Sequence, residues 1–378
     1  GGQGVLQRLT ARHMASNISL YADDVIVFCR PNKQDLSVVR RLLTLFGNAS
    51  GMYTNFNKCA ASPIRCTPAE RLAIASHFAC PIKEFPTTYL GLPLSIRKIT
   101  ASSLQPFVER LEKKLSPWWA SMLSRGKRLA LIRHVFCAMP THILIAMSLH
   151  SSILRQVNRL LRAFLWQGRK TTNGGHCLVS WAKVTALDYV GIGIPDLQRS
   201  AHALQARWLW LRKKDPSRPW QHLHIPCNPT VQAIFCASTS WQIGDDNLLF
   251  WDDHWIDGLS IAELVPLLHA LVPRRLRKAR TVAAGLPSRA WIQDVRGHLS
   301  PEALVQYVLL WARLQQVTLS DESDVLTWRW TTNGVYSAKS CYKALFFGST
   351  SPPAWCLIWK GWAPLTNKFF LWLVSLDR

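Results

Sequence analysis

Two adjacent carboxylates, Asp23 and Asp24, are the residues of this sequence best suited to chemistry. Strand-forming residues flank them at 17–21 and 25–28, which is typical of a β-hairpin with charge at its tip. Two ionised aspartates buried in mid-strand would be very costly, whereas at a turn both can face one rim and share divalent cations. Oxygen-only ligands of this kind suit Mg²⁺. The plainer interpretation is a solvated turn.

Helical and strand patterns alternate after this hairpin. Residues 32–50 carry apolar side chains at helical spacing, and Gly51 ends that helix. A short extended segment at 53–59 precedes a second helix at 67–79, and a further hairpin is predicted within 85–94. The residues expected on the buried face of the first helix are Leu36, Val39, Leu42, Leu43 and Phe46. This mixed order of strands and helices predicts an α+β fold.

Three helices with apolar inner faces and basic outer faces are predicted next, at 103–115, 125–139 and 151–166. Arginines at i, i+4 and i+7 form an outer stripe on the third helix, and a smaller basic group lies on the second. The basic residues expected to be exposed are Lys127, Arg128 and Arg133 on the second helix and Arg155, Arg159 and Arg162 on the third. Such a bundle can lie along a nucleic-acid backbone, or its arginines can form an ordinary solvated face.

The composition points to a polyanionic partner. The 378 residues contain 45 Lys and Arg against 22 Asp and Glu, a formal net charge of +23. Nucleic acid is the leading partner class. A membrane surface is the alternative, but the basic residues are spread along the chain instead of forming an amphipathic anchor. The most apolar stretch, 135–149, is interrupted by Pro140, His142 and Ser148, so no membrane partner is expected.

The ten cysteines include no Cys-x-x-Cys pair. This spacing argues against a compact disulfide framework and against a zinc knuckle. Reduced thiols in an intracellular protein, nuclear or cytoplasmic and not secreted, are the plainer interpretation, and no signal peptide is visible. The sequence leaves the oligomeric state open.

Several features of the C-terminal half need an interpretation. Its tryptophans are expected in the core more often than as clamps for single-stranded nucleic acid. The basic run at 272–280 is predicted to be an exposed linker, or else a nucleic-acid or nuclear-import patch. Leu204, Trp208 and Leu211 predict a helix that packs on the preceding three-helix bundle. The group Asp252, Asp253 and His254 is interpreted as surface or capping residues.

In order and spacing, these motifs resemble plant non-LTR (LINE-type) retrotransposon reverse transcriptases. The palm motifs are Tyr21-Ala22-Asp23-Asp24, then Gly51 with Asn55 and Lys58, then Tyr89-Leu90-Gly91-Leu92-Pro93. Residues 123–132 and 164–168 resemble the thumb, and 179–181, 191–197, 207–210, 241–245 and 250–255 resemble the connecting region. Residues 328–342 and 359–364 resemble the start of the zinc-binding domain that ends such proteins. The likeness is collinear over nearly the whole chain.

The resemblance implies an RNA-directed DNA polymerase that extends a DNA primer on an RNA template by two-metal nucleotidyl transfer with Mg²⁺. The implied catalytic and metal-binding residues are Asp23 and Asp24, while Lys58 would neutralise pyrophosphate or be a plain surface lysine. Tyr21 is expected under the primer terminus. The residues expected to contact nucleic acid elsewhere are Tyr89, Leu90 and Gly91 in a primer-grip hairpin, and Lys127, Arg128, Arg155, Arg159 and Arg162 in the thumb.

The resemblance also implies four regions. They are the C-terminal half of a polymerase palm at 1–98, a helical thumb at 99–172, a connecting region at 173–325 and the start of a zinc-binding domain at 326–378. The regions after the thumb are expected to be mixed, mostly α-helical and Trp-rich, with the basic linker near 272–280.

The departures from the family pattern predict a truncated remnant without polymerase activity. Family members need a third carboxylate on a palm strand, and a fingers region, and this chain begins after both. Asp23 and Asp24 alone cannot fix two metal ions. The family's zinc ligands would lie beyond Arg378, so no zinc is expected here. Two alternatives stay open: a non-catalytic basic module that binds nucleic acid, and a translated transposon remnant without a selected role.

Overall fold

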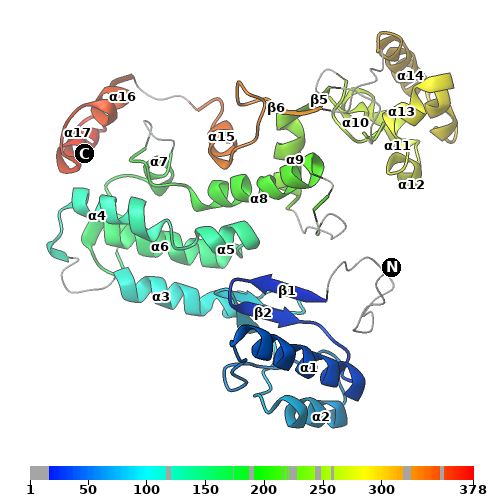
Figure 1. The fold of residues 1–378 in the computed structure, drawn as a ribbon. Coiled ribbons are helices and arrows are strands. Elements are labelled where there is room, and N and C mark those ends of the chain that lie inside the picture. The colour runs from blue at the N-terminus through cyan, green and yellow to red at the C-terminus, as the bar shows by residue number, and fades with distance from the viewer. Residues whose placement is uncertain are drawn as a thin grey trace. The chain divides into compact units, whose positions relative to one another are not determined.

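The computed structural model describes residues 17–115, 121–172, 174–186, 191–215, 217–218, 220, 228–242, 248–256, 259–317, 325–349 and 353–378. The fold is mixed, with many helices and a few short strands, as the α+β prediction requires (Figure 1). The chain forms two compact units, Gly1–Arg110 and Leu111–Arg378. The finer division into four regions stays a prediction.

The first unit begins its described part with a β-hairpin. Strands β1 (Ile18–Tyr21) and β2 (Asp24–Val27) pair antiparallel, with Tyr21 opposite Asp24. All four residues of β1 are exposed to solvent. The hairpin predicted from the sequence is therefore confirmed.

Two capped helices follow in this unit. Helix α1 (Lys33–Ser50) begins where the side chain of Asn32 accepts a hydrogen bond from the Asp35 amide, and it ends at Gly51 with φ 74°. Helix α2 (Pro68–Phe78) begins with a capping box between Thr67 and Glu70. Because caps of this kind satisfy the free amides and carbonyls of helix ends, the sequence located both helices correctly.

The face of α1 that the sequence assigned to the core is only partly buried. Leu36 and Val39 are buried, but Leu42 and Phe46 are 42% and 55% exposed. The strands described in this unit form two separate two-stranded sheets, which offer little surface to cover a long helix. The prediction that Leu42 and Phe46 are core residues is therefore wrong.

A second hairpin lies at the end of the first unit. Strands β3 (Thr87–Tyr89) and β4 (Leu92–Leu94) pair through a turn in which Leu90 and Gly91 have φ 50° and 76°. The extended segment predicted at 53–59 is instead a turn, where the Lys58 amide donates to the Asn55 carbonyl at 3.0 Å. The two hairpins described in this unit are separate two-stranded sheets, so they do not join into one palm sheet.

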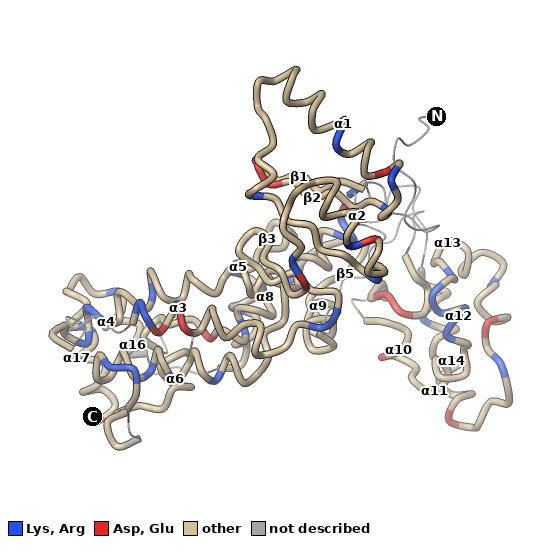
Figure 2. Tube along the Cα trace, turned by 90° about the horizontal axis from the view of Figure 1, so that it is seen from below, with Lys and Arg blue, Asp and Glu red and all other residues tan. Residues whose placement is uncertain are grey.

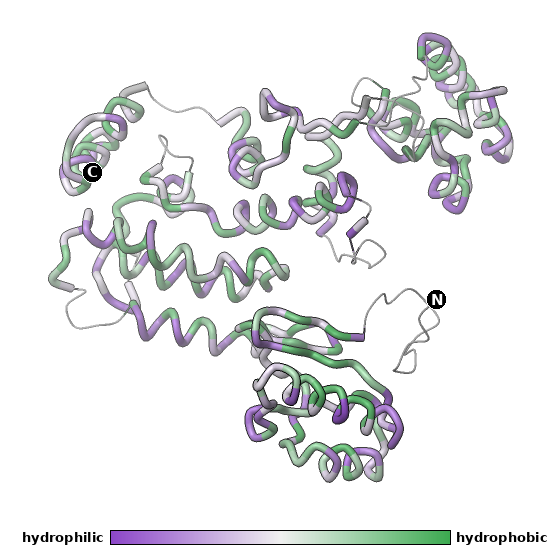
Figure 3. The backbone as a smooth tube through the Cα atoms, in the orientation of Figure 1, coloured by the Kyte–Doolittle hydropathy of each residue, from purple (hydrophilic) through white to green (hydrophobic). Residues whose placement is uncertain are grey.

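Most of the described part of the region predicted as a thumb is helical, and this region spans the boundary between the two units. A 3₁₀ turn, η1 (Ser102–Leu104), leads into α3 (Gln105–Leu115), and α6 (Ser151–Gln167) follows later. Ile153, Val157 and Leu161 of α6 are fully buried, and Figure 3 shows hydrophobic and hydrophilic positions alternating along this helix. The apolar stripe of α6 is confirmed.

The helix predicted at 125–139 is broken. Helix α4 (Arg125–Leu131) continues into the π-helical turn η3 (Ile132–Phe136), and a turn then leads to α5 (Thr141–Ala146). A π-turn adds a residue to each hydrogen-bonded loop and so rotates the following side chains. As a result Val135, which a regular helix over 125–139 would place on the inner face, is 42% exposed.

Helix α8 (Leu197–Lys214) packs on α5, as the sequence predicted. The indole nitrogen of Trp208 donates to the Ile145 carbonyl at 2.9 Å, and the side-chain amide of Gln205 donates to the Leu144 carbonyl at 3.4 Å. Between α6 and α8 lie the short η4 (Gly174–His176) and α7 (Trp181–Val184).

A Trp-rich cluster at 248–317 forms its own hydrophobic core around Phe250, Trp251, Trp255 and Trp291. Its short elements are α10 (Ile261–Leu264), α11 (Pro266–Ala270), α12 (Arg274–Arg277), α13 (Val282–Gly285), η5 (Pro287–Asp294) and α14 (Pro301–Leu314). These tryptophans are core residues, as the sequence favoured.

The basic run at 272–280 belongs to this cluster, and its residues Arg274, Arg275 and Lys278 are exposed, as the sequence predicted. Val272 is 1% exposed. Arg280 donates to both carboxylate oxygens of Asp294, at 2.8 and 2.6 Å, and the Trp251 indole donates to the same carboxylate at 3.0 Å. The run is therefore exposed in part and is anchored to the cluster at its two ends, by Val272 and by the pair of Arg280 with Asp294.

Asp252, Asp253 and His254 also have defined partners. Asp253 accepts from the Leu249 amide at 2.9 Å and from Lys213, which fits the predicted capping role. His254 is only 8% exposed, with Nε2 3.1 Å from Glu263, so it is not a surface residue.

The remaining elements pack back onto the bundle of the second unit. Helix α9 (Pro229–Ser238) leads into β5 (Thr239–Gln242), which pairs antiparallel with β6 (Val325–Trp328). Helices α15 (Ala338–Ala344), α16 (Pro353–Lys360) and α17 (Leu365–Val374) follow. Across the residues that the structure describes, no helix combines the length and apolarity that a membrane crossing needs.

Candidate nucleic-acid interface

The carboxylate pair lies at the tip of the first hairpin. Ala22, with φ 50°, and Asp23 form a two-residue turn between the paired residues Tyr21 and Asp24. Both carboxylates are exposed, and Tyr21 is 64% exposed. The structure therefore presents the two acidic side chains to solvent at a turn, where their charges cost little.

These two carboxylates do not complete a site for two Mg²⁺ ions. Within the described ranges, no three His, Cys, Asp or Glu side chains come together in a group able to hold a metal ion. Mg²⁺ demands near-octahedral oxygen ligation, and two neighbouring aspartates supply too few ligands to fix two ions. Two-metal chemistry at this hairpin would need oxygen ligands from other residues.

The other predicted palm residues lie on separate elements. Lys58 is exposed in the turn that follows α1. Tyr89 is half-buried at the end of β3, and Leu90 and Gly91 form the turn of the second hairpin. The β1–β2 and β3–β4 pairs are not hydrogen-bonded to each other, so the proposed roles of these residues stay predictions.

Helix α6 carries the basic stripe expected to meet a nucleic-acid backbone. Arg155 and Arg159 are exposed, one helical turn apart, and Figure 2 marks Lys and Arg along α4 and α6. Arg162 is different, because it is half-buried and its guanidinium lies 5.7 Å from the centre of the Trp181 ring. The stripe therefore presents two arginines to solvent, and the third is held against an aromatic ring.

On helix α4 the structure separates two neighbouring basic residues. Lys127 is exposed, but Arg128 is only 7% exposed and donates to the Ser121 carbonyl at 2.9 Å. Burial lowers the pKa of the Arg128 guanidinium, and the nearby charge of Arg125 lowers it further. The prediction that Arg128 is an exposed phosphate contact is wrong, because α4 is packed between α6 and α17 and turns this residue inward.

No protein-family model matches the chain. The chain is similar to a putative ribonuclease H protein of Arabidopsis thaliana. The two are 25% identical over 325 residues, an alignment that covers 75% of this chain. It covers 50% of the relative, so the chain spans about half the length of the curated relative it matches.

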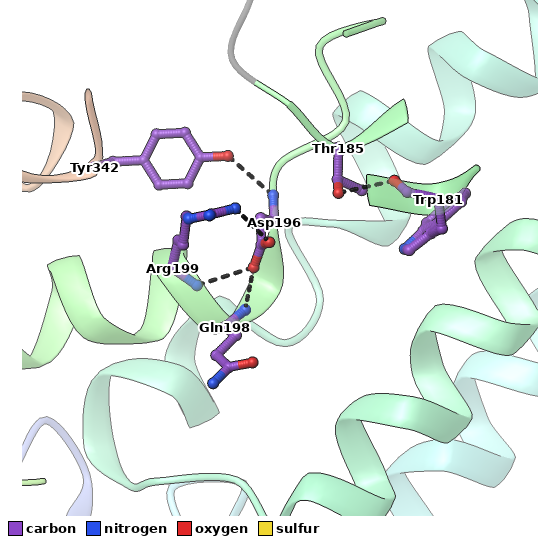
Figure 4. Close-up of polar contacts among 6 residues, drawn as sticks. All are labelled: Trp181, Thr185, Asp196, Gln198, Arg199 and Tyr342. Atoms are coloured by element: carbon purple, nitrogen blue, oxygen red, sulfur yellow. Dashed lines mark hydrogen bonds and ion pairs between the residues drawn. The ribbon is translucent and has the colours of Figure 1, made fainter. Parts of the chain in front are cut away.

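One motif that the sequence singled out has a structural role. In the segment 191–197, Asp196 caps α8 by accepting from the amides of Gln198 and Arg199 at 2.9 and 3.0 Å (Figure 4). The Asp196 amide in turn donates to the Tyr342 hydroxyl at 2.9 Å, which ties α15 to the start of α8. The spacing of an Asp before a helix could have revealed the cap, but nothing in the sequence points to Tyr342.

The glycines of the same segment allow close packing. A Cβ on Gly191 would lie 2.7 Å from the Val184 carbonyl oxygen. Gly193 has φ 71°, and a Cβ there would lie 2.6 Å from an Arg133 guanidinium nitrogen. Close by, the Thr185 hydroxyl donates to the Trp181 carbonyl at 3.0 Å, which ends α7 (Figure 4). Arg133, expected at the surface, is therefore partly covered by this segment.

Proposed function

We propose that this chain is part of a LINE-type reverse transcriptase, an RNA-directed DNA polymerase, and that its own contribution is to bind nucleic acid. The observation that carries the proposal is the Tyr21–Asp24 sequence at the exposed tip of an antiparallel hairpin. Collinear motifs over most of the chain support it. The name of the Arabidopsis relative, a putative ribonuclease, also concerns nucleic acid.

Binding is proposed for α6 and the neighbouring α4. Arg155 and Arg159 are four residues apart, which is about 6 Å along a helix axis, so both can contact one nucleic-acid backbone. Lys127 adds an exposed charge from α4. The formal net charge of +23 strengthens attraction to any phosphate backbone.

Polymerisation by this chain alone is not expected, because two carboxylates hold too few ligands for two metal ions. The binding partners proposed for this chain are the RNA template and DNA primer of the family. The main one is the RNA–DNA hybrid that they form. The alternative of a non-catalytic basic module makes the same prediction for binding, and the two differ only in ancestry.

The experiment is a salt titration of binding to a fluorescein-labelled RNA–DNA hybrid, followed by anisotropy. Replacing Arg155 and Arg159 with alanine should make the negative slope of log K against log salt shallower by about 1.8. Each phosphate contact with a duplex contributes about 0.9 to the magnitude of this slope. The matched control is Lys33→Ala with Lys83→Ala, two exposed positions outside every predicted binding region. Equal losses in both double variants would show that binding follows total charge and not the α6 face.

A further inference from the structure

Trp330 and Phe347 form an exposed aromatic pair in the second unit. They follow β6 and α15 in the sequence and are not part of α6. The rings of Trp330 and Phe347 have centroids 5.2 Å apart and planes inclined by 58°. Trp330 is 39% exposed and Phe347 is 81% exposed. Contiguous exposed apolar surface marks interaction sites on soluble proteins, and two aromatic side chains side by side supply such surface.

Both rings are held on ordered elements. Trp330 follows β6, and its indole nitrogen donates to the Ser238 hydroxyl at 2.9 Å, where Ser238 is 4% exposed. Phe347 follows α15, which is anchored by Cys341 at 0% exposure and begins with a capping box. The aromatic faces are therefore presented by a fixed scaffold, and little ordering would be needed on binding.

Positive charge lines the same surface. Lys339 and Lys343 lie one turn apart on α15 and, with Trp330 and Phe347, border an open pocket of about 370 Å³. In the part of the chain that the structure describes, neither lysine lies within 4.0 Å of a carboxylate. The sequence has no Asp or Glu between Val325 and Leu376, so this stretch of the chain adds only positive charge to the surface.

We propose that this surface binds a single-stranded polynucleotide, RNA or DNA. Bases would stack on the open faces of Phe347 and Trp330, and the backbone phosphates would pair with Lys339 and Lys343. A duplex fits less well, because its bases are stacked within the helix and leave the rings without a partner. An acidic peptide would use the lysines but would leave the rings in water.

This site is distinct from the α6 face and goes beyond the function proposed above. Because it rests on Trp330, Phe347 and the lysines of α15, it holds whether or not the chain descends from a polymerase. The test is therefore made in the full chain with Arg155 and Arg159 already replaced by alanine, so that failure at one site is distinguishable from failure at the other.

The probe is a fluorescein-labelled oligo-dT of about 12 nucleotides, beside an abasic strand of equal length. Phe347→Ala should raise Kd for oligo-dT about tenfold and leave Kd for the abasic strand unchanged, since it removes stacking alone. Phe370→Ala, which removes another exposed phenylalanine on α17, is the matched control and should change neither Kd.

The lysines are tested by the salt dependence. Lys339→Ala with Lys343→Ala should make the negative slope of log K against log salt shallower by about 1.4. Each phosphate contact with a single strand contributes about 0.7 to the magnitude of this slope. Lys33→Ala with Lys83→Ala removes the same charge from exposed positions elsewhere and should leave the slope nearly unchanged. The proposal is overturned if Phe347→Ala binds oligo-dT as before, or weakens the abasic strand equally, while circular dichroism shows a folded chain.

Discussion

Gly126 of α4 lies directly against the main chain of Thr366 at the start of α17. A Cβ on Gly126 would be 2.6 Å from the Thr366 Cα and 2.7 Å from its nitrogen. The hydroxyl oxygens of Ser124 and Thr366 are 3.5 Å apart, and the rings of Trp166 and Phe369 meet with centroids 6.0 Å apart. The C-terminal helix is thus packed on the bundle expected to be the thumb, through a contact that only a glycine permits.

Gly126→Ala should destabilise the second unit by about 1–3 kcal/mol, because the new methyl group meets backbone that cannot rotate away. Urea unfolding followed by tryptophan fluorescence measures this change. Gly175→Ala is the control, since a Cβ there meets nothing within 4 Å. Equal unfolding midpoints for the two variants would show that the α4–α17 contact is not formed in solution.

Lys127 and Arg128 should behave in opposite ways. Arg128→Ala removes a buried guanidinium and its bond to the Ser121 carbonyl, so we expect a loss of about 1–3 kcal/mol in stability. Lys127→Ala should leave stability within about 0.5 kcal/mol and weaken binding to an RNA–DNA hybrid. Measuring the unfolding midpoint and Kd of both variants checks the pair. A stable Arg128→Ala variant that binds poorly would restore the original prediction for Arg128.

Asp294 should make the Trp-rich cluster sensitive to acid. Burial raises the pKa of its carboxyl, but hydrogen bonds from Arg280 and Trp251 and the charges of Arg280 and Arg296 outweigh burial, so the pKa is lowered. A lowered pKa stabilises the folded state above the ordinary Asp value of about 3.9, and that stability is lost as the pH falls through the folded pKa.

Asp294→Asn should therefore cost about 3 kcal/mol near neutral pH, because Arg280 loses its charged partner. The penalty should begin to shrink as the pH falls below about 3.9, where the carboxyl of the unfolded chain takes up a proton, and it should be lost once the pH is below the lowered pKa of the folded carboxyl. Unfolding curves for both proteins at several pH values measure the difference. A penalty that does not vary with pH would mean that the asparagine disturbs packing and not charge.

Cys137 should be unreactive in the folded protein. It is 7% exposed, and burial raises the pKa of its thiol to about 12, so little thiolate forms at neutral pH. Alkylation with iodoacetamide followed by peptide mass spectrometry should label Cys137 only after unfolding in urea. Cys177, which is half-buried, serves as the reference in the folded state. Rapid native labelling of Cys137 would show that the core beneath η3 is open.

The carboxylate pair should not support synthesis by this chain alone. With Mg²⁺, dTTP and an oligo-dT primer on poly-rA, we expect no primer extension, because Asp23 and Asp24 supply too few metal ligands. Asp23→Ala is measured in parallel and should bind the hybrid as well as the unaltered chain does. Metal-dependent synthesis that disappears in Asp23→Ala would show that the chain is an active polymerase.

Local features of the chain were predictable because their causes lie within a few residues. The C-terminal end of α1 follows from Gly51, and the start of α2 follows from Thr67 and Pro68. The hairpin that carries Asp23 and Asp24 follows from short strands around a turn. The apolar stripe of α6 follows from its 3.6-residue period. Each of these was confirmed.

Which side of an element faces a partner was decided by contacts between distant residues. Arg128 is buried because α4 meets α17, more than two hundred residues later in the sequence. Arg280 is paired because Asp294 lies beside it, and Phe46 is exposed because few described residues cover α1. The sequence by itself determined the elements, their caps and the strongly basic charge. Only the tertiary structure decided which arginines stay in solvent to meet phosphate, because burial depends on the neighbours that folding brings together.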